Sequence, residues 1–309
     1  MKRLSKNFAS IMAWFDTTAI GDQKGDAIDA KRIIPFILMH LAVLGVFWVG
    51  FSWFAFWVAV GLYVLRMFAI TGFYHRYFSH KNFKTSRPLQ FIFAFIGASS
   101  AQRGPLWWAS HHRHHHARAD QPDDPHSPRQ RGFLWSHTLW FLSNKNFSTR
   151  SEKIKDFAQF KELVWLDRFD MLAPFILALF LFVLGAILEI YAPSLETTGG
   201  QLLVWGFFVS TVVLYHATYT INSLAHRFGS RRFETKDDSR NNPVLALITL
   251  GEGWHNNHHY YCGTVRQGFK WYEFDITFYI LKVMSWFGLV WDLKPIPEKI
   301  YRQMEQAKT

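Results

Sequence analysis

The order of apolar and polar stretches along the chain predicts membrane-spanning helices. Apolar runs occupy about residues 33–71, 171–190 and 201–221, and the polar segments between them hold almost all of the charge. Since about 20 apolar residues in a helix cross a bilayer, the first run has room for two crossings with a turn near Gly50. The pattern therefore predicts four spans, at about residues 33–51, 53–71, 171–190 and 201–221. The apolar stretch 89–101 is too short to cross and is expected to lie at the interface or against other helices.

The distribution of Lys and Arg predicts the sidedness of these spans. Residues 1–35 hold 6 of the 34, residues 72–170 hold 15 and residues 223–309 hold 12, while Arg66 lies within the second predicted span. The two predicted outer connections hold none. Because loops rich in Lys and Arg stay in the cytoplasm, both termini are predicted to be cytoplasmic. We therefore expect a cytosolic N-terminal segment, residues 1–32, and a domain, residues 33–309, whose spans carry a cytosolic helical cap built from residues 72–170 and 222–309.

Composition supports an all-α integral membrane protein rather than a soluble one. Half of the 309 residues are hydrophobic, with 31 Phe and 14 Trp, and the net charge is +11. An excess of this sign can indicate nucleic-acid binding, but here it falls in the predicted cytoplasmic loops, so no nucleic-acid partner is expected. A single cysteine, Cys262, excludes an intrachain disulfide and fits a reducing compartment.

Histidines cluster at four places, each next to a predicted span or within the predicted cap. Side chains three and four residues apart share one face of a helix, and two of the clusters have that spacing. Neutral imidazole is the commonest metal ligand, and nine imidazoles exceed the four of one tetrahedral site. The spacing therefore predicts two metal ions with four to six ligands each, and Asn222 as a further ligand that acts through a water. The nine imidazoles are those of His75, His80, His112, His115, His116, His226, His255, His258 and His259.

Histidines also have other common roles. A lone histidine such as His137 is most often surface polarity, and His40 and His216 lie in spans, where a polar side chain is costly unless it is hydrogen-bonded. A histidine-rich tract alone is also typical of the metal-sensing loop of a transporter. A transporter would place its ligands along a membrane path, whereas here nearly all histidines lie outside the spans, on one predicted face. This arrangement favours a metal centre at the cytoplasmic surface.

At these residues the chain resembles the membrane fatty acid desaturase family, in particular its acyl-CoA Δ9 (stearoyl-CoA-type) branch, in the bacterial form without a fused cytochrome b5. The three histidine boxes of the family, H-x4-H, H-x2-HH and H-x2-HH, are matched, as are the segments that flank them. The resemblance runs from about residue 33 to residue 291. The matching segments are His75–His80, His112–His116, Asp124-Pro-His126, Arg131–His137, Asn222-Ser-Leu-Ala-His226 and Gly251-Glu-Gly-Trp-His255 through His259.

The resemblance implies a function and a set of partners. Members form a mushroom shape of four spans and a cytosolic cap that holds two irons, and they use O2 to desaturate a long-chain fatty acyl thioester for unsaturated fatty acid biosynthesis. The nine imidazoles and Asn222 would then be the metal-binding and catalytic residues. The chain has no His-Pro-Gly-Gly motif, so the electron donor is expected to be a separate ferredoxin or cytochrome b5-type protein with its reductase. Histidine-rich sites also accept Zn in place of Fe.

The resemblance also marks substrate residues, and the chain departs from the family at one of them. Gln102, Trp108 and Thr218 match residues that shape the bent acyl tunnel, although ordinary packing would explain them too. Where animal members have an Arg-Asp pair that helps hold coenzyme A, this chain has Ser110-His111. This departure leaves the acyl carrier open between coenzyme A and a lipid.

Two histidines in the second cluster exceed the box pattern. They are His111 and His114, and the register of the Asp-Pro-His element excludes both from the ligand set.

The chemistry of the reaction agrees with a metal centre. The C–H bonds of methylene groups are not acidic, so no side-chain acid or base removes their hydrogens, and iron with O2 supplies the oxidation. Carboxylates are expected to orient the imidazoles, and Arg76 and Arg113 to pair with carboxylates. Candidates are Asp120, Asp123, Asp124 and Glu252, of which Asp120 is expected instead to be a solvated loop charge.

Three other functions remained open from the sequence. They are an acyl-lipid desaturase, a hydroxylase or decarboxylase on the same di-iron scaffold, and a metal transporter.

Overall fold

A computed structural model describes residues 6–19, 24–31 and 33–306, so the predicted N-terminal segment 1–32 lies partly outside the described residues. The protein is mostly helical, as expected. Three continuous helical stretches are long and apolar enough to cross a membrane, namely Trp53–Ser79, Leu172–Tyr191 and Gly199–His226. The first predicted span forms a shorter apolar helix, Ile34–Val49, of 16 residues against the roughly 20 that a crossing takes. That this helix crosses the membrane stays a prediction.

The turn near Gly50 occurs where the sequence places it. Gly50 has a φ of +71°, a left-handed conformation that glycine adopts without strain. The next helix begins directly afterwards, where the Ser52 hydroxyl accepts a hydrogen bond from the backbone N–H of Ala55. The chain therefore turns between the first and second apolar helices.

The second and fourth predicted spans continue beyond the ends predicted from hydropathy. The helix α4 (Trp53–Phe68) runs on into the π-helical segment η3 (Ala69–Ser79). The fourth is built from α11 (Gly199–Gln201), the π-helical η8 (Leu202–Val209), α12 (Ser210–Ser223) and the 3-10 turn η9 (Leu224–His226). Both extensions carry predicted metal ligands, so the helices of the predicted spans themselves bring these side chains toward the predicted cap. π-helical turns are frequent at functional sites.

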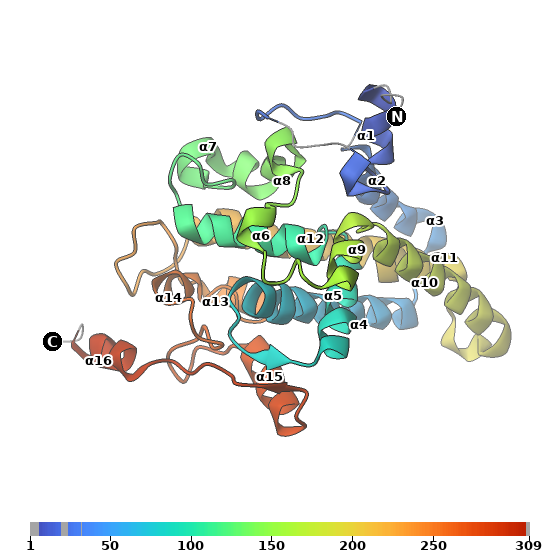
Figure 1. Cartoon of the computed structure of the whole chain (residues 1–309). Coiled ribbons are helices and arrows are strands. Elements are labelled where there is room, and N and C mark those ends of the chain that lie inside the picture. The colour runs from blue at the N-terminus through green and yellow to red at the C-terminus, as the bar shows by residue number, and fades with distance from the viewer. Residues whose placement is uncertain (1–5, 20–23, 32, 307–309) are drawn as a thin grey trace.

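The apolar helices pack side by side, and most elements of the predicted cap lie toward one end of them (Figure 1). The apolar set is completed by α2 (Ile34–Ala42), η2 (Val43–Gly45), α3 (Val46–Val49) and α10 (Leu172–Tyr191). The stretch predicted to be too short to cross forms α5 (Arg87–Ala98), which packs against η3, α4 and α9 and buries Gly97 and Ala98.

The remaining elements are short and are joined by well-packed loops. Two of them, β1 and β2, pair antiparallel with Lys84 opposite Trp291. The remaining elements are α1 (Lys6–Met12), η1 (Thr17–Ala19), β1 (Lys84–Thr85), α6 (Pro105–Arg118), α7 (Pro128–Leu134), η4 (Trp135–Leu139), α8 (Trp140–Leu142), η5 (Asn144–Asn146), η6 (Ser151–Lys153), α9 (Lys161–Arg168), η7 (Pro193–Leu195), α13 (Pro243–Ile248), α14 (His255–Tyr260), α15 (Ile276–Trp286), β2 (Val290–Trp291) and α16 (Glu298–Gln306).

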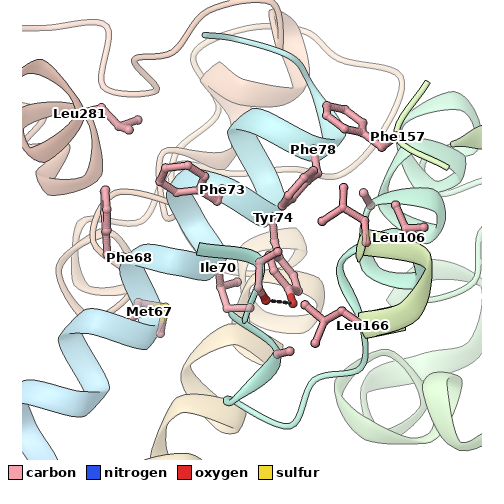
Figure 2. Packing of buried hydrophobic residues seen from close by; sticks show 14 of the residues in the cluster. Met67, Phe68, Ile70, Phe73, Tyr74, Phe78, Leu106, Phe157, Leu166 and Leu281 are labelled. Carbon is pink, nitrogen blue, oxygen red and sulfur yellow. Dashed lines mark hydrogen bonds between the residues drawn. The ribbon is translucent and has the colours of Figure 1, made fainter. Parts of the chain in front are cut away.

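The core is centred on η3, which holds the first metal-ligand candidate. Figure 2 shows Phe73, Tyr74 and Phe78 projecting from this segment into the surrounding helices. The Tyr74 hydroxyl donates to the Ala94 carbonyl oxygen at 2.8 Å, and a Cβ on Gly97 would lie 2.3 Å from the Tyr74 ring. This tight packing fixes the direction of the neighbouring residue, His75.

Candidate metal centre

The nine predicted imidazoles gather in two adjacent groups. Within each group, one nitrogen from every residue lies within 4.8 Å of the corresponding nitrogens of the others. The i, i+3, i+4 pattern does not supply one group per helix, because neighbouring histidines of α6 and α14 face different groups. The larger group comprises His75, His80, His112, His116 and His258, and the smaller comprises His115, His226, His255 and His259.

Nε2 atoms face one another across both groups. In the larger group, His258 Nε2 lies 3.0 Å from His75 Nε2 and 2.9 Å from His116 Nε2. In the smaller group, His226 Nε2 lies 3.1 Å from His255 Nε2. Such convergence at hydrogen-bond distance is what a ring of metal ligands requires.

Carboxylates contact the outward nitrogen of four of these rings. Asp124 accepts from His115 Nδ1 at 3.0 Å, and Glu252 is in close contact with His75 Nδ1. Both carboxylates are candidates from the sequence. A carboxylate at Nδ1 fixes the tautomer, so that Nε2 keeps its lone pair for a metal ion.

The other two carboxylates differ from the prediction. Asp120 was expected to be a solvated loop charge, but it is only 3% exposed and accepts from His226 Nδ1 at 3.0 Å. Asp237 accepts from His259 Nδ1 at 2.9 Å and was not predicted at all, because it comes from a loop far from any box. The remaining candidate, Asp123, instead pairs with Arg118 at the surface.

The two predicted arginines do pair with carboxylates. Arg76 is fully buried between Glu252, at 3.0 Å, and Asp275, at 2.9 Å. Arg113 pairs with Asp156 at 2.8 Å. These contacts hold the first and second boxes in place from outside the ring of imidazoles.

The orientation of two facing rings suits a cation between them. His115 and His259 each give the Nδ1 hydrogen to a carboxylate, yet their Nε2 atoms lie 3.4 Å apart. Two lone pairs at that distance repel, and a cation between them converts the repulsion into ligation. The residues present therefore fit a metal ion.

Most of these histidines do not readily gain the positive charge by protonation. Burial removes the hydration that an imidazolium needs, and it also lowers the pKa of His259 to about 4. At His115 burial also lowers the pKa, but Asp124 and the neighbouring carboxylates outweigh burial and raise it. Burial lowers the pKa well below the usual histidine range at His80, His112, His116, His255 and His258.

The charge of the site matches two divalent ions. Arg76 and Asp275 neutralise each other, which leaves four carboxylates against the imidazoles among the described residues. Burial opposes their ionisation, but at Asp120 the interaction with His226 and the hydrogen bonds from Ser127 and the Asp238 backbone together outweigh burial, and the pKa lies below the usual range. Four negative charges balance two doubly charged metal ions. The four carboxylates are Asp120, Asp124, Asp237 and Glu252.

The histidines excluded from the ligand set do point elsewhere. His111 Nε2 lies 3.1 Å from the Ser148 carbonyl oxygen, and His114 Nε2 lies 3.1 Å from that of Asp123. The buried His126 was not singled out as a ligand, although its ring lies 4.1 Å from that of His115. The position of His126 in the Asp-Pro-His motif was the sequence feature that could have marked it.

A cavity of about 180 Å³ leads to the larger group. A second one of about 40 Å³ continues past it, and both have mainly apolar walls. Trp108, Thr218 and Asn222 line both cavities, and the Trp108 ring stacks on that of His112 at 5.0 Å. Gln102 lines the larger cavity and donates to the Thr218 hydroxyl at 3.2 Å. All three predicted tunnel residues therefore meet where the two cavities join.

Asn222 lies beside the imidazoles, at both cavities. Its side chain lines both cavities next to His112, and its carbonyl oxygen accepts from the Ser136 hydroxyl at 2.6 Å. This position fits the predicted action through a water.

Comparison with known proteins decides the family. The profile of the fatty acid desaturase family matches residues 51–285. The chain belongs to this family. The match spans three boxes, the NSxAH element and both long apolar helical stretches that carry ligands, so the desaturase resemblance is confirmed.

Individual relatives differ in carrier and in bond position. An sn-2 palmitoyl-lipid 9-desaturase of Nostoc sp. (strain 36) is 36% identical over 284 residues, 88% of this chain and 93% of the relative. An acyl-CoA 5-desaturase of Anemone leveillei is 36% identical over 262 residues, 84% and 77% respectively. A delta-9 acyl-lipid desaturase of Arabidopsis thaliana is 34% identical over 288 residues, 92% and 88%. The protein is thus an oxidoreductase of the fatty acid desaturase type, with apolar helices typical of a membrane protein.

Proposed function

We propose that the protein uses O2 to convert a methylene pair of a long-chain fatty acyl chain, carried as a coenzyme A thioester, into a Δ9 double bond at a di-iron centre. The observation that carries the proposal is the convergence of nine imidazole nitrogens beside an apolar cavity. The reaction balances when one O2, two electrons and two protons are consumed, two hydrogens leave the chain, and two waters form.

The imidazoles of the two groups would hold the irons, five around one and four around the other. Iron bound there would supply the oxidation of unactivated C–H bonds that no side chain can perform. The protein fixes each ring: Asp124, Asp120 and Asp237 keep the Nδ1 hydrogens of their histidines turned outward. Each Nε2 lone pair is thereby held in place without a rearrangement on binding.

The cavity would position the acyl chain and exclude water. Trp108 and His112 both line the larger cavity with their rings stacked, so an acyl chain that follows these walls passes close to the centre. Gln102 and Thr218 are joined by a hydrogen bond and line the larger cavity, and Thr218 also lines the smaller one. We assign these two residues to the bend of the acyl chain.

The proposal includes a topology and partners. All four apolar helices would span the membrane, with both termini and the metal centre in the cytoplasm. Electrons would come from a separate ferredoxin or cytochrome b5-type donor with its reductase. The positive charge of the predicted cytosolic segments would attract an acidic donor.

A lipid-bound acyl chain is the second candidate substrate, and two observations favour it. Ser110 and His111 are buried and make hydrogen bonds inside the cap, where they cannot contact coenzyme A. Among the described residues that line the larger cavity, Arg103 is the one cation, and it is paired with Asp170 at 2.7 Å. Coenzyme A phosphates would need cations from elsewhere.

Product analysis separates these candidates. Purified iron-loaded protein with a donor chain and O2 is supplied with stearoyl-CoA or with a stearoyl phospholipid, and the acyl products are measured by mass spectrometry. We expect a monoene two mass units lighter from stearoyl-CoA, whereas a monoene from the phospholipid alone would establish the lipid carrier. A hydroxylase would add one oxygen, and a decarboxylase would remove CO2. Absence of any oxidised acyl product from either carrier, with both irons present, would exclude the proposed function.

A further inference from the structure

Three histidines outside both metal groups form a chain that joins α2, α12 and the cap. His40 Nε2 lies 3.2 Å from His216 Nε2, and His216 Nδ1 lies 3.0 Å from His137 Nε2. His216 uses both nitrogens of its ring, each toward a different neighbour, so the contacts follow one another in line. Nitrogens in line do not surround a metal ion as those of the two metal groups do.

Both ends of this chain finish on carbonyl oxygens. At one end, His40 Nδ1 lies 2.8 Å from the Phe36 carbonyl oxygen. At the other, His137 Nδ1 lies 2.9 Å from the Ser223 hydroxyl, which donates to the Tyr219 carbonyl oxygen at 3.0 Å. A carbonyl oxygen only accepts, so each end of the chain requires a hydrogen.

When all three imidazoles are neutral, the histidine chain has one hydrogen fewer than its contacts need. The chain makes five contacts, and each needs one hydrogen. Three neutral imidazoles bring one each and the Ser223 hydroxyl brings one, which gives four. All five hydrogen bonds form together only when one imidazole carries an additional proton.

The helix at one end of the chain is a wall of the larger cavity. Pro35, Phe36 and Met39 of α2 line that cavity, and Tyr215 of α12 lines it opposite Phe36. All of α2 is described, and none of its residues is buried. The contact of His40 with His216 therefore ties this wall of the cavity to α12.

We propose that His40, His216 and His137 hold one shared proton, and that this proton fastens α2 to α12 and the cap, closing one wall of the acyl cavity. That the cavity holds an acyl chain rests on the proposed function. The proton-binding chain itself does not, since it uses none of the imidazoles of the two metal groups. His137, predicted to be plain surface polarity, thereby gains a role, while the hydrogen bonds predicted for His40 and His216 in the spans are present.

The surroundings of His137 decide how readily the shared proton is lost. Burial and the neighbouring His216 lower the pKa of His137, while a hydrogen bond to the Tyr219 carbonyl oxygen opposes that shift. Besides the three histidines, the titratable groups against the rings are Tyr215 and Tyr219. The chain is therefore charged at low pH and neutral as the pH rises.

The arginines of the adjacent α7 are paired elsewhere. Arg129 pairs with Asp238, and Arg131 pairs with Asp26. The charge of the histidine chain is therefore set by its own proton.

Backbone hydrogen exchange of α2 tests the proposal without any turnover. The full-length iron-loaded protein in lipid nanodiscs is compared between pH 5.5 and 8.5 by mass spectrometry, with exchange times scaled for the intrinsic pH dependence. We expect peptides from α2 to exchange about tenfold faster at the high pH, since one charge-assisted hydrogen bond is lost. The variant His137→Gln is expected to exchange fast at both pH values.

Val213→Ala is the matched control, because Val213 lies on α12 near His216 but is exposed and outside the chain. This variant should keep the pH dependence of the unmodified protein. Equal α2 exchange at both pH values in the unmodified protein, or an unchanged pH dependence in His137→Gln, would overturn the proposal. If the exchange result is as expected but no acyl product forms in the product assay, the proposed function fails while the proton-binding chain stands.

Discussion

The variant His115→Ala is expected to lose one metal ion per chain and to lower desaturation by more than about 100-fold. His115 contributes Nε2 to the smaller group, and Asp124 fixes its ring. Removing one of four imidazoles leaves an incomplete set around that ion, a larger loss than the roughly 10- to 100-fold typical of outer partners of metal ligands. Metal content by elemental analysis and product formation by mass spectrometry are measured on the same sample.

His114→Ala is the matched control, since it removes the preceding imidazole from the same helix. Its Nε2 faces the Asp123 carbonyl oxygen rather than either group, so this variant should keep two metal ions and most of the activity. If both variants lost metal equally, the division of α6 into ligands and bystanders would be wrong.

The second large effect is expected at Asp237, the carboxylate behind His259. In Asp237→Asn, an amide replaces the acceptor at 2.9 Å from His259 Nδ1, so the tautomer and the ring direction are no longer fixed. Iron affinity should fall about 10- to 100-fold, and excess iron should restore much of the activity. Iron titration followed by product formation measures both quantities.

The adjacent Asp238 offers a close comparison. Its side chain pairs with Arg129 near the surface and contacts no imidazole among the described residues. Asp238→Asn should therefore bind iron as the unmodified protein does. Equal loss of affinity in both variants would indicate that the loop acts through its fold, and an unaffected Asp237→Asn would remove the carboxylate from the account.

Much of the centre follows from sequence because spacing within one helix is local. Histidines three and four apart on α6 and α14 must share a face, and spans rich in apolar residues must bring His75 and His226 to the same end. The division into groups of five and four does not follow, because it depends on the angle at which α6 crosses α14 and the ends of the spans. Neighbouring imidazoles such as His115 and His116 fall on different sides of that crossing.

The incorrect and missing predictions have a common cause, which is the tertiary packing of the chain. Asp120 and Asp237 come from loops whose sequence looks solvated, and only the packing of those loops against the cap buries their carboxylates. His137 looks like an isolated polar residue until the fold brings it to His216. Hydropathy also does not show where the helices end, since polar ligand-bearing turns continue the helices of the second and fourth predicted spans to Ser79 and His226.

The number of irons in the active protein tests the central claim most directly. Protein loaded anaerobically with ferrous iron is freed of unbound metal, and bound iron is counted per chain while X-ray absorption reports the ligand atoms. The two groups predict two irons per chain with imidazole nitrogen as the dominant ligand. One iron per chain at full activity, or ligation dominated by carboxylate oxygen, would contradict the account.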